Sequence, residues 1–222
     1  MCGTTVQIEY LPLKGGVDLA TGQDRRAWEA TLDTLGKQPG LKSLFWGRQT
    51  ENPDVLQVVT EWESLNAHKA FIATPEHRLF QETLHTELLA GPPKSFHVTL
   101  PVTKPSANPL CAPVTECLSG YFSATYTSAE YDAQFAKFKD LVAKTPNVPS
   151  QGINGGWIIE PQKYESLGDG VEGKGRMTFI GWPSVESHVN FTKLEVFQKM
   201  APLLGNGPQG ATLWHVAFTQ YK

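Results

Sequence analysis

One stretch of this sequence occurs twice, and the duplication constrains the fold more than any other feature. In residues 62–100 and again in 182–218, a tryptophan is followed six residues later by a histidine and nine residues later by a phenylalanine. A Phe-Gln pair comes next, and each copy closes on an aromatic-His-Val step. An ordered series of this kind indicates a tandem duplication, so we expect two similar folding units.

The hydrophobic pattern around each copy predicts the order strand-helix-strand-strand-helix-strand, which is the ferredoxin-like arrangement. In the first half, strands are expected at residues 5–13, 44–46, 55–62 and 95–100, with helices at 24–36 and after Ser64. In the second half, strands are expected at residues 116–127, 157–159, 176–182 and 211–219, with helices after Ser128 and Ser184. Serine is a preferred residue at helix N-termini, where its hydroxyl accepts a backbone hydrogen bond.

These elements predict an α+β protein with three segments along the chain. Residues 1–100 form the first ferredoxin-like unit and residues 114–222 form the second, while residues 101–113, with four prolines, form the linker. A four-stranded unit of this type leaves one sheet face without helices, and soluble proteins avoid exposing such an apolar patch. We therefore expect the two antiparallel sheets to face each other in an α/β barrel with the helices outside.

Composition excludes several classes of protein. The net charge of −3 leaves no basic surface for nucleic acid, and no apolar run approaches the roughly 20 residues that span a bilayer. The first residues lack the pattern of a secretory signal. Three cysteines (Cys2, Cys111 and Cys117) form an odd set, which suits a reducing compartment. The expectation is a cytoplasmic protein that binds neither nucleic acid nor membrane.

The sequence also lacks the common motifs of nucleotide and hydrolase chemistry. It has no Gly-x-Gly-x-x-Gly after a strand, no Walker loop, no Gly-x-Ser-x-Gly elbow and no His-Glu-x-x-His. Its histidines and cysteines lack the spacing of metal ligands, so no metal site is expected. If the chain is an enzyme, we expect it to work by proton transfer in a dry pocket, without an organic cofactor.

The candidate catalytic residues follow from strand alternation. In each closing strand the histidine, His97 or His215, lies opposite a more apolar face. If the apolar faces meet the helices, both histidines point into the barrel, where Glu61 or Glu9 could orient them for acid–base chemistry. His68 is a further candidate base. The remaining ligand-binding candidates are polar or aromatic residues expected near the cavity: Gln7, Glu9, Tyr121, Ser123, Trp46, Trp157 and His188.

A structural role is the alternative for each of these residues. His97 and His215 could be hydrogen-bonded packing residues inherited from the ancestral unit. His68 and His188 stand near the start of a helix, where the partial positive charge favours a neutral imidazole that locks the helix to a strand. Glu9 and Glu61 could be solvated at strand ends.

The segment WESLNAHKAFIATPEH (residues 62–77) resembles the antibiotic-biosynthesis-monooxygenase-like and stress-responsive members of the dimeric α/β-barrel superfamily. Those proteins usually pair two chains, whereas this sequence resembles the fused tandem form found in some fungal proteins. The second copy lacks the Thr-Pro-Glu-His step and has Thr192-Lys193-Leu194-Glu195 instead, so the halves need not do the same job. The superfamily includes cofactor-free oxygenases, polyketide cyclases, isomerases, haem enzymes and proteins without assigned activity, so the fold alone selects no reaction.

Three functions remain open at this point. The first is a cofactor-independent enzyme that uses histidine acid–base chemistry on a small aromatic or polyketide-like molecule, as a cyclase, dehydratase, decarboxylase or oxygenase. The second is a non-catalytic binding or stress-responsive barrel. The third is a haem protein with a histidine as axial ligand. The expected partner is a small apolar or aromatic molecule, and the fused barrel could form a homodimer.

Overall fold

The computed structural model describes residues 3–222, which divide into two compact units. The first unit contains the described residues up to Val102 together with Val216–Lys222, and the second contains Thr103–His215. The last seven residues therefore lie with the first unit, although sequence order groups them with the second. Cys2 lies outside the described residues.

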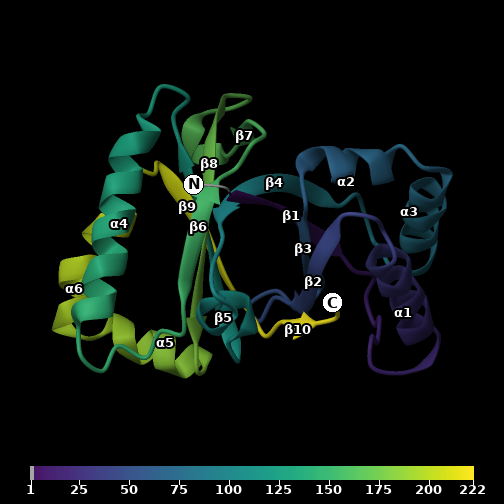
Figure 1. The fold of residues 1–222 in the computed structure, drawn as a ribbon, viewed down its shortest axis with the longest axis horizontal. Helices are drawn as coiled ribbons and strands as arrows, with labels where there is room; N and C mark the ends of the chain where they lie inside the picture. The colour runs from purple at the N-terminus through teal and green to yellow at the C-terminus, as the bar shows by residue number, and fades with distance from the viewer. Residues whose placement is uncertain (1–2) are drawn as a thin grey trace. The chain divides into compact units, whose positions relative to one another are not determined.

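The first unit has the predicted ferredoxin-like order, and Figure 1 shows its helices on one side of its sheet. Its strands form an antiparallel sheet in the order β10-β2-β3-β1-β4. The elements are β1 (Gly3–Pro12), α1 (Gly22–Gly36), β2 (Leu41–Arg48), β3 (Val55–Trp62), α2 (Leu65–Ile72), α3 (Pro75–Glu87), β4 (Lys94–Pro101) and, from the C-terminus, β10 (Thr219–Gln220).

The second unit repeats this order with an additional hairpin strand and a divided final helix. It begins with two short 3-10 helices, η1 (Pro105–Ala107) and η2 (Pro109–Cys111), within the proline-rich segment. Its main strands lie in the order β6-β8-β5-β9, and β7 pairs with β8. The elements are β5 (Val114–Phe122), α4 (Ser128–Lys144), β6 (Ile153–Trp157), β7 (Gln162–Lys163), η3 (Glu165–Leu167), β8 (Glu172–Trp182), α5 (Val185–Thr192), α6 (Glu195–Met200), α7 (Pro202–Gly205) and β9 (Gly210–Val216). The α+β class and the paired ferredoxin-like units are thus confirmed.

Helices α2 and α5 begin where the sequence predicts, because their capping serines are present. By contrast, α1 begins at Gly22 rather than at residue 24, and Thr127 instead of Ser128 is the N-cap of α4; neither of these two helices has a side-chain cap. Ser64 and Ser184 each precede a helix and accept a hydrogen bond from the backbone N–H three residues later, at 3.1 and 3.0 Å. Thr74 does the same for α3, with Pro75 at its first position. Among the described residues no helix is both long enough and apolar enough to cross a membrane.

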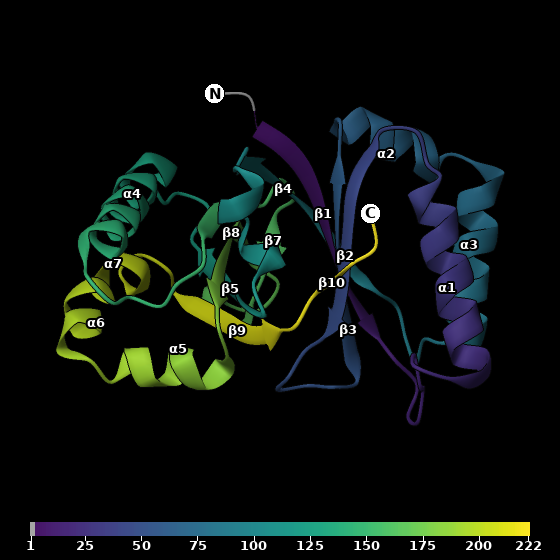
Figure 2. The same cartoon turned by 60° about the horizontal axis from the view of Figure 1, so that its bottom comes forward.

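Each unit packs its helices onto one face of its own sheet, and these layers hold the core. Figure 2 shows α4, α5, α6 and α7 on one side of β8, β5 and β9. In α4 the aromatic face predicted by the spacing of Tyr131, Phe135 and Phe138 is buried against this sheet. In the first unit, Trp28, Leu32 and other side chains of α1 pack on the first sheet in the same way.

The closing strands are oriented opposite to the prediction. His97 lies across from Gln7 in the β1–β4 register and contacts His68 of helix α2, so it points toward the helices. The apolar residues Phe96 and Val98 point to the helix-free face instead. The prediction failed because Phe96, His97 and Val98 are all buried, at 2, 9 and 0 % exposure. Where both faces of a strand are buried, the difference in polarity between the faces does not identify the one that meets the helices.

The same correction applies to the second unit and to β1. His215 contacts His188 of helix α5, so its ring also lies on the helix side of its sheet. Gln7 and Glu9 share a face of β1 with Leu11, which belongs to the helix-side core of the first unit. The expectation that these four side chains point away from the helices is therefore wrong.

Candidate functional site

A buried pair of histidines recurs in both units and joins the two ends of the sequence repeat. His68 Nδ1 lies 2.7 Å from His97 Nε2, and His188 Nδ1 lies 2.8 Å from His215 Nε2. The repeat tryptophan packs on the helix-borne ring in each case, with centroid distances of 4.7 Å for His68 and 4.8 Å for His188. A direct N···N hydrogen bond requires one donor and one acceptor, so in each pair one ring nitrogen carries the proton and the other can receive it.

A carboxylate joins the histidine pair in the second unit. Glu116, on β5, accepts a hydrogen bond at Oε2 from Trp182 Nε1 at 2.9 Å. The same Oε2 lies 3.4 Å from His188 Nε2. Glu116, His188 and His215 therefore form a continuous chain of polar contacts, which we call the Glu116 relay. Glu116 is only 4 % exposed.

Burial changes the chemistry of Glu116. Desolvation raises the pKa of this carboxyl from 4.5 to about 7, while the Trp182 hydrogen bond and the charge of His215 act in the opposite direction. A carboxyl with a pKa near neutrality can both take and return a proton under physiological conditions. Sequence analysis missed Glu116 because an acid near the start of a strand usually faces solvent.

The equivalent position in the first unit is a neutral amide. Thr5 pairs with Trp62 and Val114 pairs with Trp182, so Gln7 and Glu116 each lie two residues further along the matching strand. In the first unit Trp62 Nε1 donates to Thr60 Oγ1 at 2.9 Å, and that hydroxyl donates to Gln7 Oε1 at 3.1 Å. The first unit thus keeps the tryptophan and the histidines without the acid.

Glu9 is a second buried acid, two residues beyond Gln7 in the first unit. Burial alone raises the pKa of its carboxyl from 4.5 to about 7. Its counterpart in the second unit is Leu118, by the same spacing. Glu9 therefore has the same raised pKa as Glu116 but lies in the first unit.

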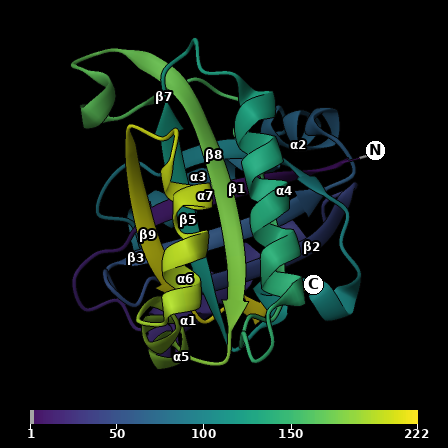
Figure 3. The same cartoon turned by 90° about the vertical axis from the view of Figure 1, so that its left-hand side faces the viewer.

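The Glu116 relay borders a cavity of about 430 Å³ that lies within the second unit, between its sheet and its helices. Figure 3, which looks onto those helices, shows α4 and α6 lying over the strands. Its lining includes Glu116, Trp182 and His188 together with apolar rings such as Phe138 and Phe191. Leu213 of the edge strand β9 also lines it and is 38 % exposed. This volume falls in the range of ordinary small-molecule sites.

Arg176 lines the same cavity at a distance from the relay. It lies on the same face of β8 as Thr178 and Trp182, four residues before Ile180, which pairs with Glu116. At about 3.3 Å per strand residue, about 13 Å of strand separates the two positions. The guanidinium packs on Phe135 at 3.9 Å and Nη1 donates to Thr178 Oγ1 at 2.9 Å. Arg176 was not among the predicted site residues, because it is the first residue of the strand expected at 176–182 and follows Lys174 closely.

The other predicted site residues lie outside this cavity. Glu61 is on the helix-free face of β3 and accepts hydrogen bonds from Thr4 and Ser43, at 2.8 and 3.2 Å. Tyr121, on the helix-free face of β5, stacks on Tyr164 with ring centroids 4.1 Å apart. Ser123 follows the end of β5.

The two predicted tryptophans pack against other aromatic residues. Trp46 meets Trp28 edge-on at 5.4 Å beside the core of the first unit. Trp157 donates from Nε1 to Asp132 at 3.0 Å and packs on Phe122 in the second unit. Neither ring lines the cavity that holds the Glu116 relay. Across residues 3–222, no group of three His, Cys, Asp or Glu side chains is arranged to hold a metal ion.

The fold and the cavity define a tandem ferredoxin-like protein with a largely apolar cavity under the helices of its second unit. Residues 23–83, in the first unit, match the family model described as antibiotic biosynthesis monooxygenase. This match confirms the family resemblance that residues 62–77 predicted. The cavity and the Glu116 relay lie in the second unit, beyond the matched residues.

Solved structures share the fold over the whole chain. A putative monooxygenase from Lactobacillus acidophilus aligns with a TM-score of 0.59 and 12% identity, covering 98% of this chain and 95% of its own. A putative monooxygenase from Fusobacterium nucleatum gives 0.61 and 12%, covering 100% and 98%. An anthrone oxidase-like protein gives 0.65 and 9%, covering 98% and 93%. At these identities the likeness concerns the fold, including its two-unit length. No curated protein matches the chain.

Proposed function

We propose that the chain is a cofactor-independent oxygenase that acts on a small aromatic or polyketide-like molecule in the cavity of its second unit. The observation that carries the proposal is the Glu116 relay beside a largely apolar pocket. The family match and the naming of the structural neighbours as monooxygenases or oxidase-like proteins favour oxygenation over cyclisation, dehydration or decarboxylation.

Glu116 is the group that meets the substrate in this proposal. Its carboxylate lines the cavity and, with a pKa of about 7, can remove a proton from a phenol or from carbon next to a carbonyl. His188, whose Nε2 lies 3.4 Å from the carboxylate, shares that proton, and His215 holds the imidazole in place. The carboxyl returns to its starting state when the proton leaves along the relay.

Removal of this proton makes the substrate electron-rich enough to reduce dioxygen. For an activated methylene group the balance is R₂CH₂ + O₂ → R₂C=O + H₂O, in which one oxygen atom stays on carbon and the other leaves as water. The substrate supplies all the electrons, so the reaction needs no external reductant. The protein's task is to form the anion and to keep bulk water away from it.

The experiment is oxygen uptake at about pH 7 with a panel of dihydroxyanthrones and naphthols, because a base with this pKa is half ionised there. Glu116→Gln and His188→Asn should each lower kcat/KM by roughly 10²–10⁴-fold, the usual contribution of acid–base catalysis. The matched control is His68→Asn, which disrupts the equivalent pair in the first unit and should leave the rate within about twofold. Equal losses in His68→Asn and His188→Asn would contradict the assignment of the site to the second unit.

A binding protein is the second candidate, and the first unit favours it. His68 and His97 make the same contact in a unit where Gln7 stands at the position of Glu116, as an inherited packing pair would. Wild-type protein that binds the panel but consumes no oxygen above the buffer rate would support this function and overturn the first. In that case His188→Asn should lower the melting temperature as much as His68→Asn does.

A further inference from the structure

Arg176 is a buried cation whose only ion-pair partner among the described residues is a half-exposed acid. Its side chain is 3 % exposed, and its Nε has no hydrogen-bond partner among the residues that the structure describes. The partner, Asp132, forms an ion pair with Nε at 3.6 Å, a distance too long for a good hydrogen bond. Asp132 is also 51 % exposed and already accepts a hydrogen bond from Trp157.

The surroundings of Arg176 hold the guanidinium in place and leave it able to donate. Its flat face packs on Phe135 at 3.9 Å and lies 5.3 Å from the ring of Tyr131. Stacking of this kind fixes a guanidinium without using its N–H groups. Taking a cation out of water is costly, and Asp132 is an exposed partner at 3.6 Å, so a second negative charge arriving from the cavity would stabilise the guanidinium further.

We propose that Arg176 is an anion subsite, so that the cavity takes an aromatic molecule with a carboxylate or an ionised phenol at the end remote from Glu116. This inference rests on the proposed function only in treating the cavity as the substrate site. A guanidinium can donate two parallel hydrogen bonds to a carboxylate, which fixes orientation as well as charge. Thr178, which accepts from Nη1 and also lines the cavity, stands beside the same group.

The two charged groups that line the cavity also determine the orientation in which the ligand binds. Glu116 repels an anion when it is ionised, whereas Arg176 attracts one, and about 13 Å of strand separates them. A ligand longer than a single ring is needed to reach both positions. The reacting carbon is then held at the Glu116 end and the anionic group at the Arg176 end.

The test compares two probes with the same ring skeleton: anilinonaphthalene sulfonate, which is anionic, and phenylnaphthylamine, which is neutral. Fluorescence titration of the wild-type protein should show tighter binding of the anionic probe. Arg176→Met should lower the affinity for the anionic probe by roughly 10- to 100-fold, as expected for the loss of a charged hydrogen-bonded contact. Its affinity for the neutral probe should stay within about twofold of the wild-type value. Arg176→Lys keeps the charge and should retain part of the preference.

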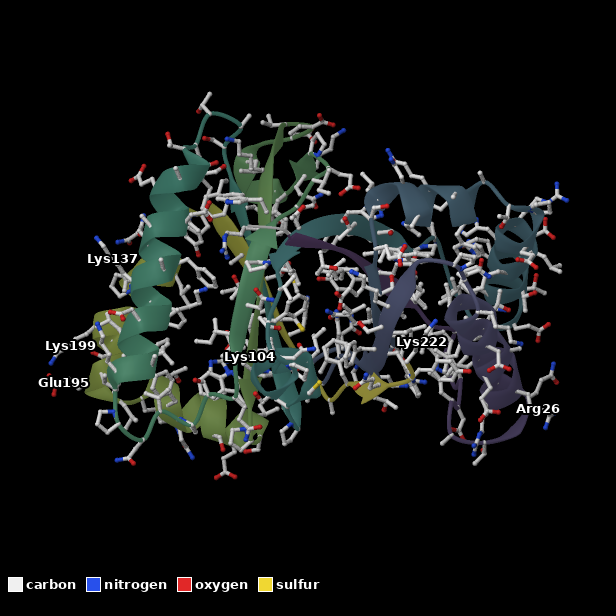
Figure 4. The ribbon with its side chains drawn as sticks, in the orientation of Figure 1. Arg26, Lys104, Lys137, Glu195, Lys199 and Lys222 are labelled. Atoms are coloured by element: carbon white, nitrogen blue, oxygen red, sulfur yellow. The ribbon has the colours of Figure 1, made fainter. Side chains whose placement is uncertain are left out.

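Lys137→Met is the matched control, because it removes an exposed cation from the same helix that packs on Arg176. Figure 4 shows Lys137 on the outer side of α4, away from the sheet. This variant should bind both probes as the wild type does. Equal affinity of the wild-type protein for the two probes would overturn the subsite. A preference for the anionic probe that survives in Arg176→Met would overturn it as well. Loss of both probes together would show a structural role for Arg176 and overturn it too.

Failure of the subsite and failure of the proposed function give different results. Glu116→Gln should abolish oxygen uptake but keep the preference for the anionic probe. If Glu116→Gln keeps its activity while Arg176→Met loses the preference, the oxygenase proposal fails and the subsite stands. If the reverse is found, the subsite fails and the oxygenase proposal stands.

Discussion

Replacement of Glu116 by glutamine should stabilise the protein at alkaline pH. Burial raises the pKa of this carboxyl in the folded protein to about 7, from the ordinary glutamate value of 4.5. Between these values the folded protein holds a proton that the unfolded chain has lost, so the free energy of unfolding falls as the pH rises. A difference of about 2.5 units corresponds to about 3 kcal/mol, all of it lost above pH 7 and none below pH 4.5.

Glutamine removes this penalty and keeps the contacts. Its amide oxygen, in the place of Oε2, can still accept the hydrogen bond from Trp182 Nε1 and can still face His188 Nε2. Above pH 7 we therefore expect Glu116→Gln to be about 3 kcal/mol more stable than the wild type, with the difference vanishing near pH 4.5. Protonation of the histidines affects both proteins and largely cancels in the comparison.

The assay is urea unfolding, followed by circular dichroism and tryptophan fluorescence across this pH range. The two midpoint curves should meet at acidic pH and separate as the pH rises. The same variant should lose oxygenase activity, and the wild-type kcat/KM should rise through a pKa of about 7 as Glu116 ionises. A stability difference that does not depend on pH, or a variant less stable than the wild type at pH 8, would refute the reasoning.

Three further predictions use other parts of the structure. Glu9→Gln should give a similar gain, about 3 kcal/mol above pH 7 in the same urea assay, without changing the turnover measured by oxygen uptake. Trp182→Phe removes the hydrogen bond that lowers the pKa of Glu116, so the acidic limb of the pH–rate profile should move up by about one unit. Gly152→Ala should destabilise by about 2–4 kcal/mol in urea unfolding, because φ is +98° and the new Cβ would lie 2.4 Å from the carbonyl oxygen of Ala107. Its control, Gly170→Ala, also has a positive φ of +70° but meets nothing within 4 Å, so it should cost only about 1 kcal/mol.

The sequence was sufficient for the repeat, the order of elements and the starts of α2 and α5, because these depend on local patterns. Ser64 and Ser184 could be assigned as caps from their position before an apolar helical run. The orientation of His97 and His215 could not be assigned, since in both strands the more apolar face lies away from the helices and alternation alone does not show which face meets them. That choice is made by packing against helices that are distant in sequence.

The acid of the candidate site was hidden for a related reason. The pKa of Glu116 depends on burial by the helices and on its contact with Trp182, neither of which is visible in a strand pattern. Comparison of the two copies contained a usable signal, because Gln7 and Glu116 occupy matching positions and are polar in both. A position that is polar in both copies of a duplicated strand is therefore a better candidate for a site residue than one chosen from the polarity of a single strand face.

The place of β10 has a consequence for synthesis and for engineering. Thr219 and Gln220 pair with Trp46 and Phe45, and Lys222 Nζ donates to the carbonyl of Gly36 at 2.8 Å. The first sheet therefore gains its outer strand only after residues 219–222 have been synthesised, more than 150 residues after β2. A fragment that stops at the proline-rich segment would leave β2 as a bare edge open to pairing with another copy.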